Sequence, residues 1–137
     1  MSGSPAHNQP TGFGTVTPYL VADAPEALAD FLKTVFDAVE IGRTQRPGGP
    51  IANMQLRIGT VTLMLSQSTA KLPAMAGAWY VYVDEADAVM QRALDAGATE
   101  ILAVADMDYG DRQGGVQDAW GHIWWISQRL DSAPYHP

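Results

Sequence analysis

The feature that most constrains the fold of this chain is an internal duplication. The run V-A-D-A-P-E-A-L-A-D-F-L, with D-A-V-E-I after it, returns as V-D-E-A-D-A-V-M-Q-R-A-L, with D-A-G-A-T-E-I after it. The copies start at Val21 and Val83, an offset too long for the period of a solenoid. Neither half can bury both faces of its own sheet, so the two halves are expected to pack together.

Apolar periodicity predicts one helix in each half. Asp23 is expected to cap the first helix, with Pro25 in its first turn. Asp84 is expected to cap the second, which should end at Gly97. Alternating and β-branched runs predict strands at 15–21, 38–46, 51–58 and 61–66, and again at 79–83, 99–104, 115–117 and 122–127.

These elements predict an α+β fold of two tandem βαβββ modules, which form a curved mixed sheet around a cleft with the helices outside. A single domain is expected over residues 15–130, with modules at 15–67 and 78–130. Residues 1–14 are aperiodic and rich in Gly, Pro and Ser, so a disordered tail is expected there. Residues 131–137 are expected to form a second tail.

Composition excludes several classes of protein. Cysteine is absent, which removes disulfides and thiolate chemistry. The formal net charge of −7 argues against nucleic acid as a partner and weakly favours neutral or cationic ligands. No apolar run approaches the length of a membrane span, and no signal pattern opens the chain. A cytoplasmic protein with no membrane partner is therefore expected.

The stretch from Tyr109 to Ile126 closes the second half with H-I-W-W-I. Trp124 and Trp125 are adjacent on a predicted strand, so their side chains must point to opposite faces of the sheet. One face can be the hydrophobic core. The other is expected to line a cavity, because a fully exposed indole leaves a large apolar surface in water.

The duplicated plan and the closing D-x-x-G-H-x-W-W-I resemble the vicinal oxygen chelate superfamily, the glyoxalase and bleomycin-resistance fold. The loop Y-G-D-R at Tyr109, with G-G-V and Asp118 behind it, resembles the PhnB-like branch in particular. The resemblance covers residues 15–130. Ala119-Trp120 departs from the family, which usually has proline and a further residue before the glycine. Because members of this superfamily usually pair, the resemblance implies a homodimer.

Enzymes of this family hold a divalent metal with four side chains, two from each half, drawn from His, Glu and Gln. Counting along the family pattern places these positions at Val16, Met64, Ala78 and Trp125. None of the four can bind Zn²⁺, Mg²⁺ or Fe²⁺ as an imidazole or a carboxylate does. Their immediate neighbours also lack a good ligand. The resemblance therefore implies a member with no metal and no cofactor.

The alternation of side chains along each strand separates a cavity side from a helix side. The cavity side is expected to hold the four positions above together with Pro18, Leu20, Thr62, Ser66, Tyr80, Tyr82, Ile123 and Ser127. The helix side is expected to hold Val21, Leu63, Trp79, Val81, Val83, Trp124 and Ile126. The residues expected to contact a ligand are Trp125, Tyr80, Tyr82, Met64, Thr62, Pro18, Tyr109 and Asp108.

Two groups of side chains each leave two interpretations open. Tyr80, Tyr82 and Trp125 could form an aromatic box for a planar or cationic group, or they could fill a collapsed core without a ligand. The acidic loop that includes Asp108 and Tyr109 could be paired internally through Arg112, or it could form a rim that contacts a polar or cationic ligand.

His122 is the only histidine between the expected tails, and strand parity directs it away from the cavity. A structural role is therefore favoured over a catalytic one.

Two functions of different classes follow. The first is a metal-free protein that binds or sequesters an antibiotic-like compound. The second is a cofactor-free isomerase or lyase that uses Tyr80, Tyr82 or the loop carboxylates as acid and base. The sequence contains no nucleophile–base pair and no pair of inward carboxylates, which favours binding. A metal-dependent lyase or dioxygenase is disfavoured by the missing ligands.

Overall fold

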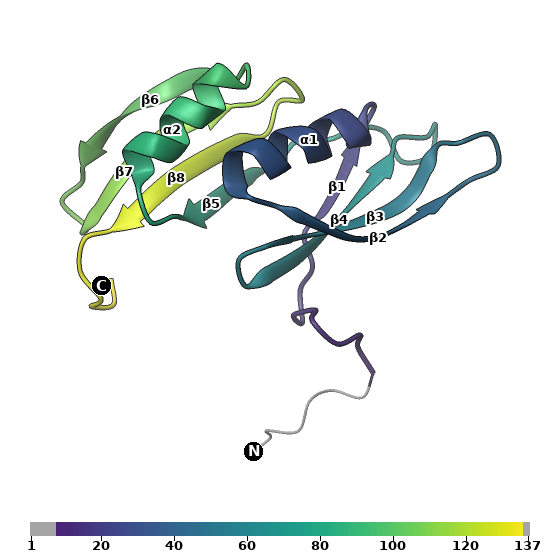
Figure 1. The fold of residues 1–137 in the computed structure, drawn as a ribbon, viewed down its shortest axis with the longest axis horizontal. Coiled ribbons are helices and arrows are strands. Elements are labelled where there is room, and N and C mark those ends of the chain that lie inside the picture. The colour runs from purple at the N-terminus through teal and green to yellow at the C-terminus, as the bar shows by residue number, and fades with distance from the viewer. Residues whose placement is uncertain (1–7, 136–137) are drawn as a thin grey trace.

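The computed structural model describes residues 8–135, which form two βαβββ modules with both helices on the same side of the sheets (Figure 1). The N-terminal module consists of β1 (Tyr19–Ala22), α1 (Pro25–Phe36), β2 (Val39–Gln45), β3 (Ile51–Ile58) and β4 (Val61–Gln67). The C-terminal module consists of β5 (Ala78–Tyr82), α2 (Ala86–Asp95), β6 (Thr99–Asp106), β7 (Asp111–Gln117) and β8 (Ile123–Arg129). The predicted fold class is confirmed.

The eight strands form two four-stranded mixed sheets, ordered β1-β4-β3-β2 and β5-β8-β7-β6. In each sheet the first strand of the module pairs in parallel with the last, and the remaining pairs are antiparallel. The same order in both sheets reflects the duplication in the sequence. β1 and β5 are both edge strands, so each sheet is complete within its own module.

The two modules share one hydrophobic core between the helices and the sheets. The predicted apolar face of α1 is buried, and Arg92 of α2 donates a hydrogen bond to the carbonyl oxygen of Val35 over 2.9 Å. Phe36 of α1 packs against Trp124 of β8 with 5.2 Å between ring centroids. The two modules are thus joined by contacts of α1 with α2 and of the end of α1 with β8.

The helices begin one residue later than predicted, and neither predicted cap is used. The N-cap of α1 is Ala24, while Asp23 accepts a hydrogen bond from the hydroxyl of Ser68. The N-cap of α2 is Glu85 rather than Asp84. The first free N–H of α2, on Ala86, donates instead to the side-chain oxygen of Gln128 on β8 over 3.0 Å. Strand β8 thus supplies an acceptor for one of the free N–H groups at the start of α2.

Strand β7 is longer than the predicted 115–117 and begins at Asp111. The glycine pair inside it made this segment look like a loop, but each glycine accommodates a large neighbour. A Cβ on Gly114 would lie 2.9 Å from the sulfur of Met90, and a Cβ on Gly115 would lie 2.5 Å from the ring of Trp125. The missing side chains of this pair therefore leave room for Met90 on one face of β7 and for Trp125 on the other.

Part of the predicted N-terminal tail packs on the N-terminal sheet. The carbonyl oxygen of Gly12 accepts hydrogen bonds from Arg57 Nη1 at 2.8 Å and from Thr62 Oγ1 at 2.7 Å. Residues 1–7 and 136–137 of the predicted tails lie outside the described residues. Within residues 8–135, neither helix is long and apolar enough to cross a lipid bilayer.

Candidate functional site

Each sheet has one face that packs on the helices and one face that points away from them, here called the open face. On the C-terminal sheet, the open face is built from rows of side chains that cross β5, β8 and β7. The first row is Tyr80, Trp125 and Gly115, the second is Tyr82, Ser127 and Gln113, and the third contains Arg129 and Asp111. The predicted cavity side of this sheet is therefore its open face.

Three aromatic side chains dominate the C-terminal open face. Tyr80 is 45% exposed and Tyr82 is 50% exposed, and their ring centroids are 5.4 Å apart. Trp125 is half-buried and lies over Gly115, which has no side chain to hold it off the sheet. Ser127 is buried between the aromatic residues, so a small side chain forms the floor of this face.

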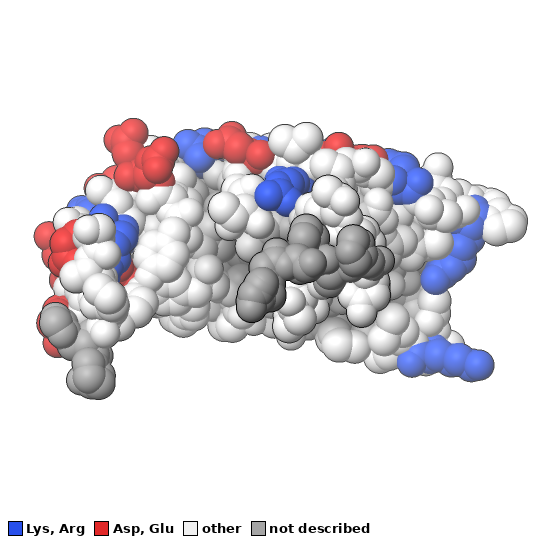
Figure 2. Space-filling model, turned by 90° about the horizontal axis from the view of Figure 1, so that it is seen from below, with Lys and Arg blue, Asp and Glu red and all other residues white. Residues whose placement is uncertain are grey.

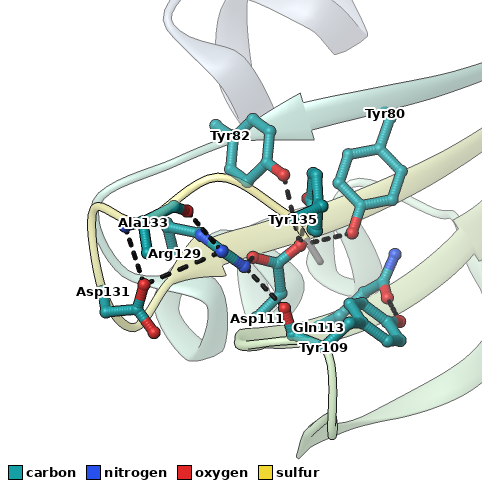
Figure 3. Close-up of polar contacts among 9 residues, drawn as sticks. All are labelled: Tyr80, Tyr82, Tyr109, Asp111, Gln113, Arg129, Asp131, Ala133 and Tyr135. Carbon is teal, nitrogen blue, oxygen red and sulfur yellow. Dashed lines mark hydrogen bonds and ion pairs between the residues drawn. The ribbon is translucent and has the colours of Figure 1, made fainter. Parts of the chain in front are cut away.

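Asp111 is a fully buried carboxylate at the end of the same face. Figure 3 shows the phenol groups of Tyr80, Tyr82 and Tyr135 converging on it. Its Oδ2 accepts hydrogen bonds from Tyr80 at 2.5 Å, from Tyr135 at 2.7 Å and from Tyr82 at 3.2 Å. Its Oδ1 pairs with Arg129 Nη1 at 3.1 Å. The buried charge is thus compensated by one cation and three hydroxyl donors.

The phenol of Tyr80 is held in its protonated form. Burial raises the pKa of this phenol well above its ordinary value of 10.0, and the hydrogen bond to the Asp111 carboxylate raises the pKa further. Both causes disfavour a phenolate, since its negative charge would be desolvated beside another negative charge. Tyr80 therefore acts as a hydrogen-bond donor at neutral pH.

The acidic loop is partly paired through Arg112, as one of the two interpretations of the sequence held. Arg112 bridges Asp106 at 2.9 Å and Asp87 of α2 at 3.0 Å. Asp111 does not join this pairing, because it faces Arg129 on the open face while Arg112 lies on the opposite face of β7. Asp108 is exposed in the turn between β6 and β7.

Tyr109, from the same turn, bends toward the open face and donates a hydrogen bond to the side-chain oxygen of Gln113 (Figure 3).

The expected lining of the N-terminal sheet needs a correction at β1. Leu20 pairs with Leu65 and faces the helices, whereas Tyr19 pairs with Met64 and Val21 with Ser66 on the open face. Leu20 and Val21 were thus assigned to the wrong sides. Val21 pairs with Ser66 as Tyr82 pairs with Ser127. Val21 therefore corresponds to Tyr82 in the second module, and not to Val83 as expected.

Of the expected contacts on the N-terminal sheet, Thr62 and Met64 do lie on its open face. Thr62 is buried beneath Gly12, and the sulfur of Met64 lies 3.4 Å from Asn53 Nδ2. The expected ligand-contact residues are therefore divided between two sheets. Those on β5 and β8, with Tyr109, lie together, while Thr62 and Met64 lie on the other module.

The corrected alignment also moves the first metal position from Val16, which is 85% exposed, to Thr17. The full set is then Thr17, Met64, Ala78 and Trp125, which contains no imidazole and no carboxylate. Among residues 8–135, no group of three His, Cys, Asp or Glu side chains is placed to hold a metal ion. These residues do not fit a divalent metal centre of the family type.

A cavity of about 760 Å³ lies between the two modules, along the edge strand β5. Its walls include Phe36 from α1, Leu63 from β4 and Trp124 from β8. The cavity is also lined by Pro18, Tyr80 and Tyr82. Strand β5 lies between this cavity and the C-terminal open face. Tyr80 and Tyr82 thus border both the cavity and the C-terminal open face.

His122 lies on the helix side of the C-terminal sheet, in the orientation predicted. It is buried, and its Nδ1 accepts hydrogen bonds from the backbone N–H of Gly77 at 3.0 Å and from Trp79 Nε1 at 3.1 Å. Burial lowers the pKa of this imidazole, and the nearby Asp118 carboxylate acts in the opposite direction. The neutral ring is thus an acceptor within the fold.

The sequence did not identify Arg129, Gln113 or Tyr135 as members of the site, and it placed Asp111 in a loop. One signal was present: Asp111, Gln113 and Gly115 follow the two-residue spacing of one strand face. No comparable signal marks Tyr135, because it lies beyond the last periodic segment.

Comparison with known proteins agrees with the fold and the duplicated topology. Residues 12–126 match the model of the Glyoxalase/Bleomycin resistance protein/Dioxygenase superfamily, and the chain belongs to this superfamily. It is 37% identical over 124 residues to the protein Mb0911c of Mycobacterium bovis, with 82% of each chain covered.

Two solved structures are similar in fold. The crystal structure of TioX from Micromonospora sp. ML1 has a TM-score of 0.70 and 24% identity, covering 85% of this chain and 100% of that one. The PhnB protein from Bacillus cereus has a TM-score of 0.65 and 15% identity, covering 84% of this chain and 99% of that one. These identities bear on the fold alone.

Proposed function

We propose that this protein binds a small aromatic or cationic compound on the C-terminal open face and sequesters it without the help of a metal or another cofactor. The observation that carries the proposal is the cluster of Tyr80, Tyr82 and Trp125 on one face of one sheet. Two exposed tyrosines beside a half-buried tryptophan favour a planar or cationic partner, which can stack on them. Convergent polar groups beside an apolar surface are typical of a small-molecule site.

The alternative is a cofactor-free isomerase or lyase that uses the same tyrosines as acid and base. The hydrogen bonds at Asp111 argue against it. Tyr80 and Tyr82 both donate to this carboxylate, and the raised pKa of the Tyr80 phenol makes it a poor base and a poor acid near neutral pH. Asp111 is itself fully buried and already holds four donors. These contacts favour binding over turnover.

We further propose that two copies of the chain pair through their open faces. Large hydrophobic side chains on these faces are exposed, including Tyr19 at 45%, Val39 at 60% and Ile101 at 43%. Exposed apolar surface of this kind favours burial against a partner. Seen from below in Figure 2, the acidic side chains lie mainly along the upper edge and at the left end, and basic side chains lie along the upper edge and at the right end. A second copy would enclose the aromatic residues and shield a bound compound.

Two finer assignments are also part of the proposal. The Y-G-D-R segment with G-G-V behind it supports placement in the PhnB-like branch of the superfamily. A cytoplasmic location, as expected from the sequence, is the second assignment.

The test is a calorimetric titration with proflavine, which is both planar and cationic, and with its neutral planar counterpart anthracene-9-methanol. Trp125→Ala should weaken binding of at least one of these probes. Trp120→Ala serves as the matched control, because Trp120 is also half-buried but packs against Phe31 on the helix side. Mass spectrometry after incubation should return the probe unchanged at one equivalent per site. Equal affinity of the wild type and Trp125→Ala for both probes would refute the proposed site.

A further inference from the structure

The segment after β8 folds back onto the C-terminal open face. Arg129 at the end of β8 donates from Nη2 to the carbonyl oxygen of Ala133 at 2.6 Å, and the N–H of Ala133 donates to Asp131 Oδ1 at 2.8 Å. These two hydrogen bonds turn the chain around the guanidinium group. Figure 3 shows the result, with Tyr135 directed toward Asp111 beside the tyrosines of the sheet.

The Tyr135 phenol makes three contacts with its surroundings. Its hydroxyl donates to Asp111 Oδ2 over 2.7 Å. The guanidinium carbon of Arg129 lies 4.6 Å from the centre of its ring, which is a cation–π contact. The ring of Tyr109 lies 6.5 Å away, centroid to centroid, at an angle of 54°. Even so, Tyr135 is 50% exposed.

We propose that this corner of the open face is a subsite for an aromatic ring that carries a hydroxyl group, and that Tyr135 is its internal occupant, which a free ligand of this class displaces. The inference rests on the proposed function and names the ligand class for that site. Asp111, Arg129 and Tyr109 are the groups that would recognise the ligand, in the way they now hold Tyr135.

The chemistry of Asp111 selects a hydroxyl donor. An ionised carboxylate only accepts hydrogen bonds, so the group opposite Oδ2 must carry a proton. A ring with an ether or a carboxylate at that position offers no donor, so the hydrogen bond that Tyr135 now makes to Oδ2 would be lost. Tyr80 and Tyr82 stay in place as donors on either side, so the ligand's hydroxyl replaces that of Tyr135 alone.

Arg129 selects the ring and disfavours a cation in this corner. Its guanidinium lies over the face of Tyr135 and is paired with Asp111 over 3.1 Å. An ammonium group placed there would be repelled by Arg129 and would find the carboxylate charge already compensated. A cationic part of a ligand would therefore have to lie toward Trp125, at the other end of the face.

Tyr135 is suited to displacement because it is held by its side chain on a short segment outside the sheet. An occupant of this kind lowers the apparent affinity of a competing ligand by the fraction of molecules in which the corner is open. If the corner is open in about one molecule in ten, removing Tyr135 raises the affinity for a phenol about tenfold.

The probe is p-cresol, the tyrosine side chain as a free molecule, and its matched control is 4-methylanisole, in which a methyl ether replaces the hydroxyl. Both are titrated into the wild type, Tyr135→Phe and Tyr135→Ala of the full chain, with binding followed by NMR. Tyr135→Ala should bind p-cresol about tenfold more tightly than the wild type does, and Tyr135→Phe should lie between them. Tyr135→Ala should bind 4-methylanisole more weakly than p-cresol, and the resonances that p-cresol shifts should include those of Tyr82 and Tyr109.

Equal affinity of the wild type and Tyr135→Ala for p-cresol would overturn the inference, as would equal binding of the ether and the phenol. Circular dichroism melting should confirm that both variants are folded. Should Tyr135→Ala fail to fold, Tyr135→Phe carries the test, because it keeps the ring and removes only the hydroxyl. The test of the subsite can fail without the proposed function failing. Binding of planar compounds that depends on Trp125 but not on Tyr135 would overturn the subsite and still support the aromatic site.

Discussion

The indole N–H of Trp124 donates a hydrogen bond to Asp118 Oδ2 over 2.8 Å, and this bond ties strand β8 to the turn that precedes it. The same carboxylate accepts the backbone N–H groups of Trp120 and His122 at 2.9 Å each. Trp124 is 3% exposed, whereas its neighbour Trp125 lies on the open face. Adjacent residues of one type therefore hold different positions: one is fixed in the core and the other faces outward.

The first prediction compares these two tryptophans. Trp124→Ala should lower the free energy of unfolding by about 3–5 kcal/mol, because it leaves a cavity against Phe36 and an unpaired oxygen on Asp118. Trp125→Ala should cost less stability and should weaken binding of a planar or cationic ligand by about 1–3 kcal/mol. Urea denaturation and calorimetric titration of both variants measure these effects. The reverse assignment, with Trp124 sensitive to ligand and Trp125 essential for folding, would contradict the strand register.

The second prediction concerns the glycine pair of β7. Gly115→Ala places a Cβ 2.5 Å from the ring of Trp125, so the indole must move off the sheet. We expect weaker ligand binding with a small loss of stability, because Trp125 is half-exposed and can shift. Gly114→Ala places its Cβ 2.8 Å from Val104 and 3.2 Å from the backbone oxygen of Leu102, inside the core. It should lower stability by about 1–3 kcal/mol, as overpacking does. Thermal melting should therefore show a lower melting temperature for Gly114→Ala than for Gly115→Ala.

How much of the site the sequence could predict depends on where each residue lies in the alternation of its strand. Ala78 and Trp125 were placed on the cavity side by the family pattern, and Tyr80 and Tyr82 share the parity of Ala78 on β5, so their common face followed from alternation. β1 has only four residues and follows Pro18, which leaves too little pattern to fix its register. The error of one residue at Leu20 and Val21 arose there.

The pairing of Asp111 with Arg129 lay beyond the reach of a single sequence. The two residues face each other only because β7 and β8 are antiparallel with a particular register, and nothing local in either strand encodes that register. Arg112, the nearer arginine in the sequence, lies on the opposite face of β7. Tyr135 is further still from prediction, since its position depends on a turn held by side chains of Arg129 and Asp131.

The third prediction concerns metal. With Thr17, Met64, Ala78 and Trp125 at the four family positions, no side chain there offers a strong ligand for a divalent ion. Dialysis against a chelator should change neither the melting temperature nor the affinity for proflavine. Elemental analysis of untagged protein is the independent measurement. Stoichiometric zinc or iron that is lost together with stability would show that the assigned positions are wrong.

The fourth prediction concerns assembly. Pairing through the open faces should give a particle of twice the chain mass in light scattering at micromolar concentration. Val39→Asp and Ile101→Asp, which add charge at exposed apolar positions on the two open faces, should shift the mass toward the monomer. Val16→Asp is the control, because Val16 is 85% exposed and lies before β1. A wild type that stays monomeric at these concentrations would rule out a stable dimer.

The last prediction concerns the dependence of stability on pH, which His122 should dominate between about pH 8 and pH 5.5, since carboxylates titrate mainly below this window. The buried Nδ1 accepts two hydrogen bonds, and burial lowers the pKa of the imidazole from its ordinary value of 6.5. Above pH 6.5 the ring is neutral in both the folded and the unfolded chain, so it adds no dependence on pH. As the pH falls through 6.5, the unfolded chain takes up a proton that the folded chain does not, and the free energy of unfolding decreases until the lowered pKa of the folded state is reached.

Urea denaturation at several pH values across this window measures the effect. His122→Asn is the control, because the amide oxygen can accept the hydrogen bond from Gly77 but does not titrate. This variant should be less stable than the wild type at pH 8, and its unfolding midpoint should vary less between pH 8 and pH 5.5. If the unfolding midpoint changed equally with pH in the two proteins, the imidazole of His122 would take up its proton as readily in the folded chain as in the unfolded one.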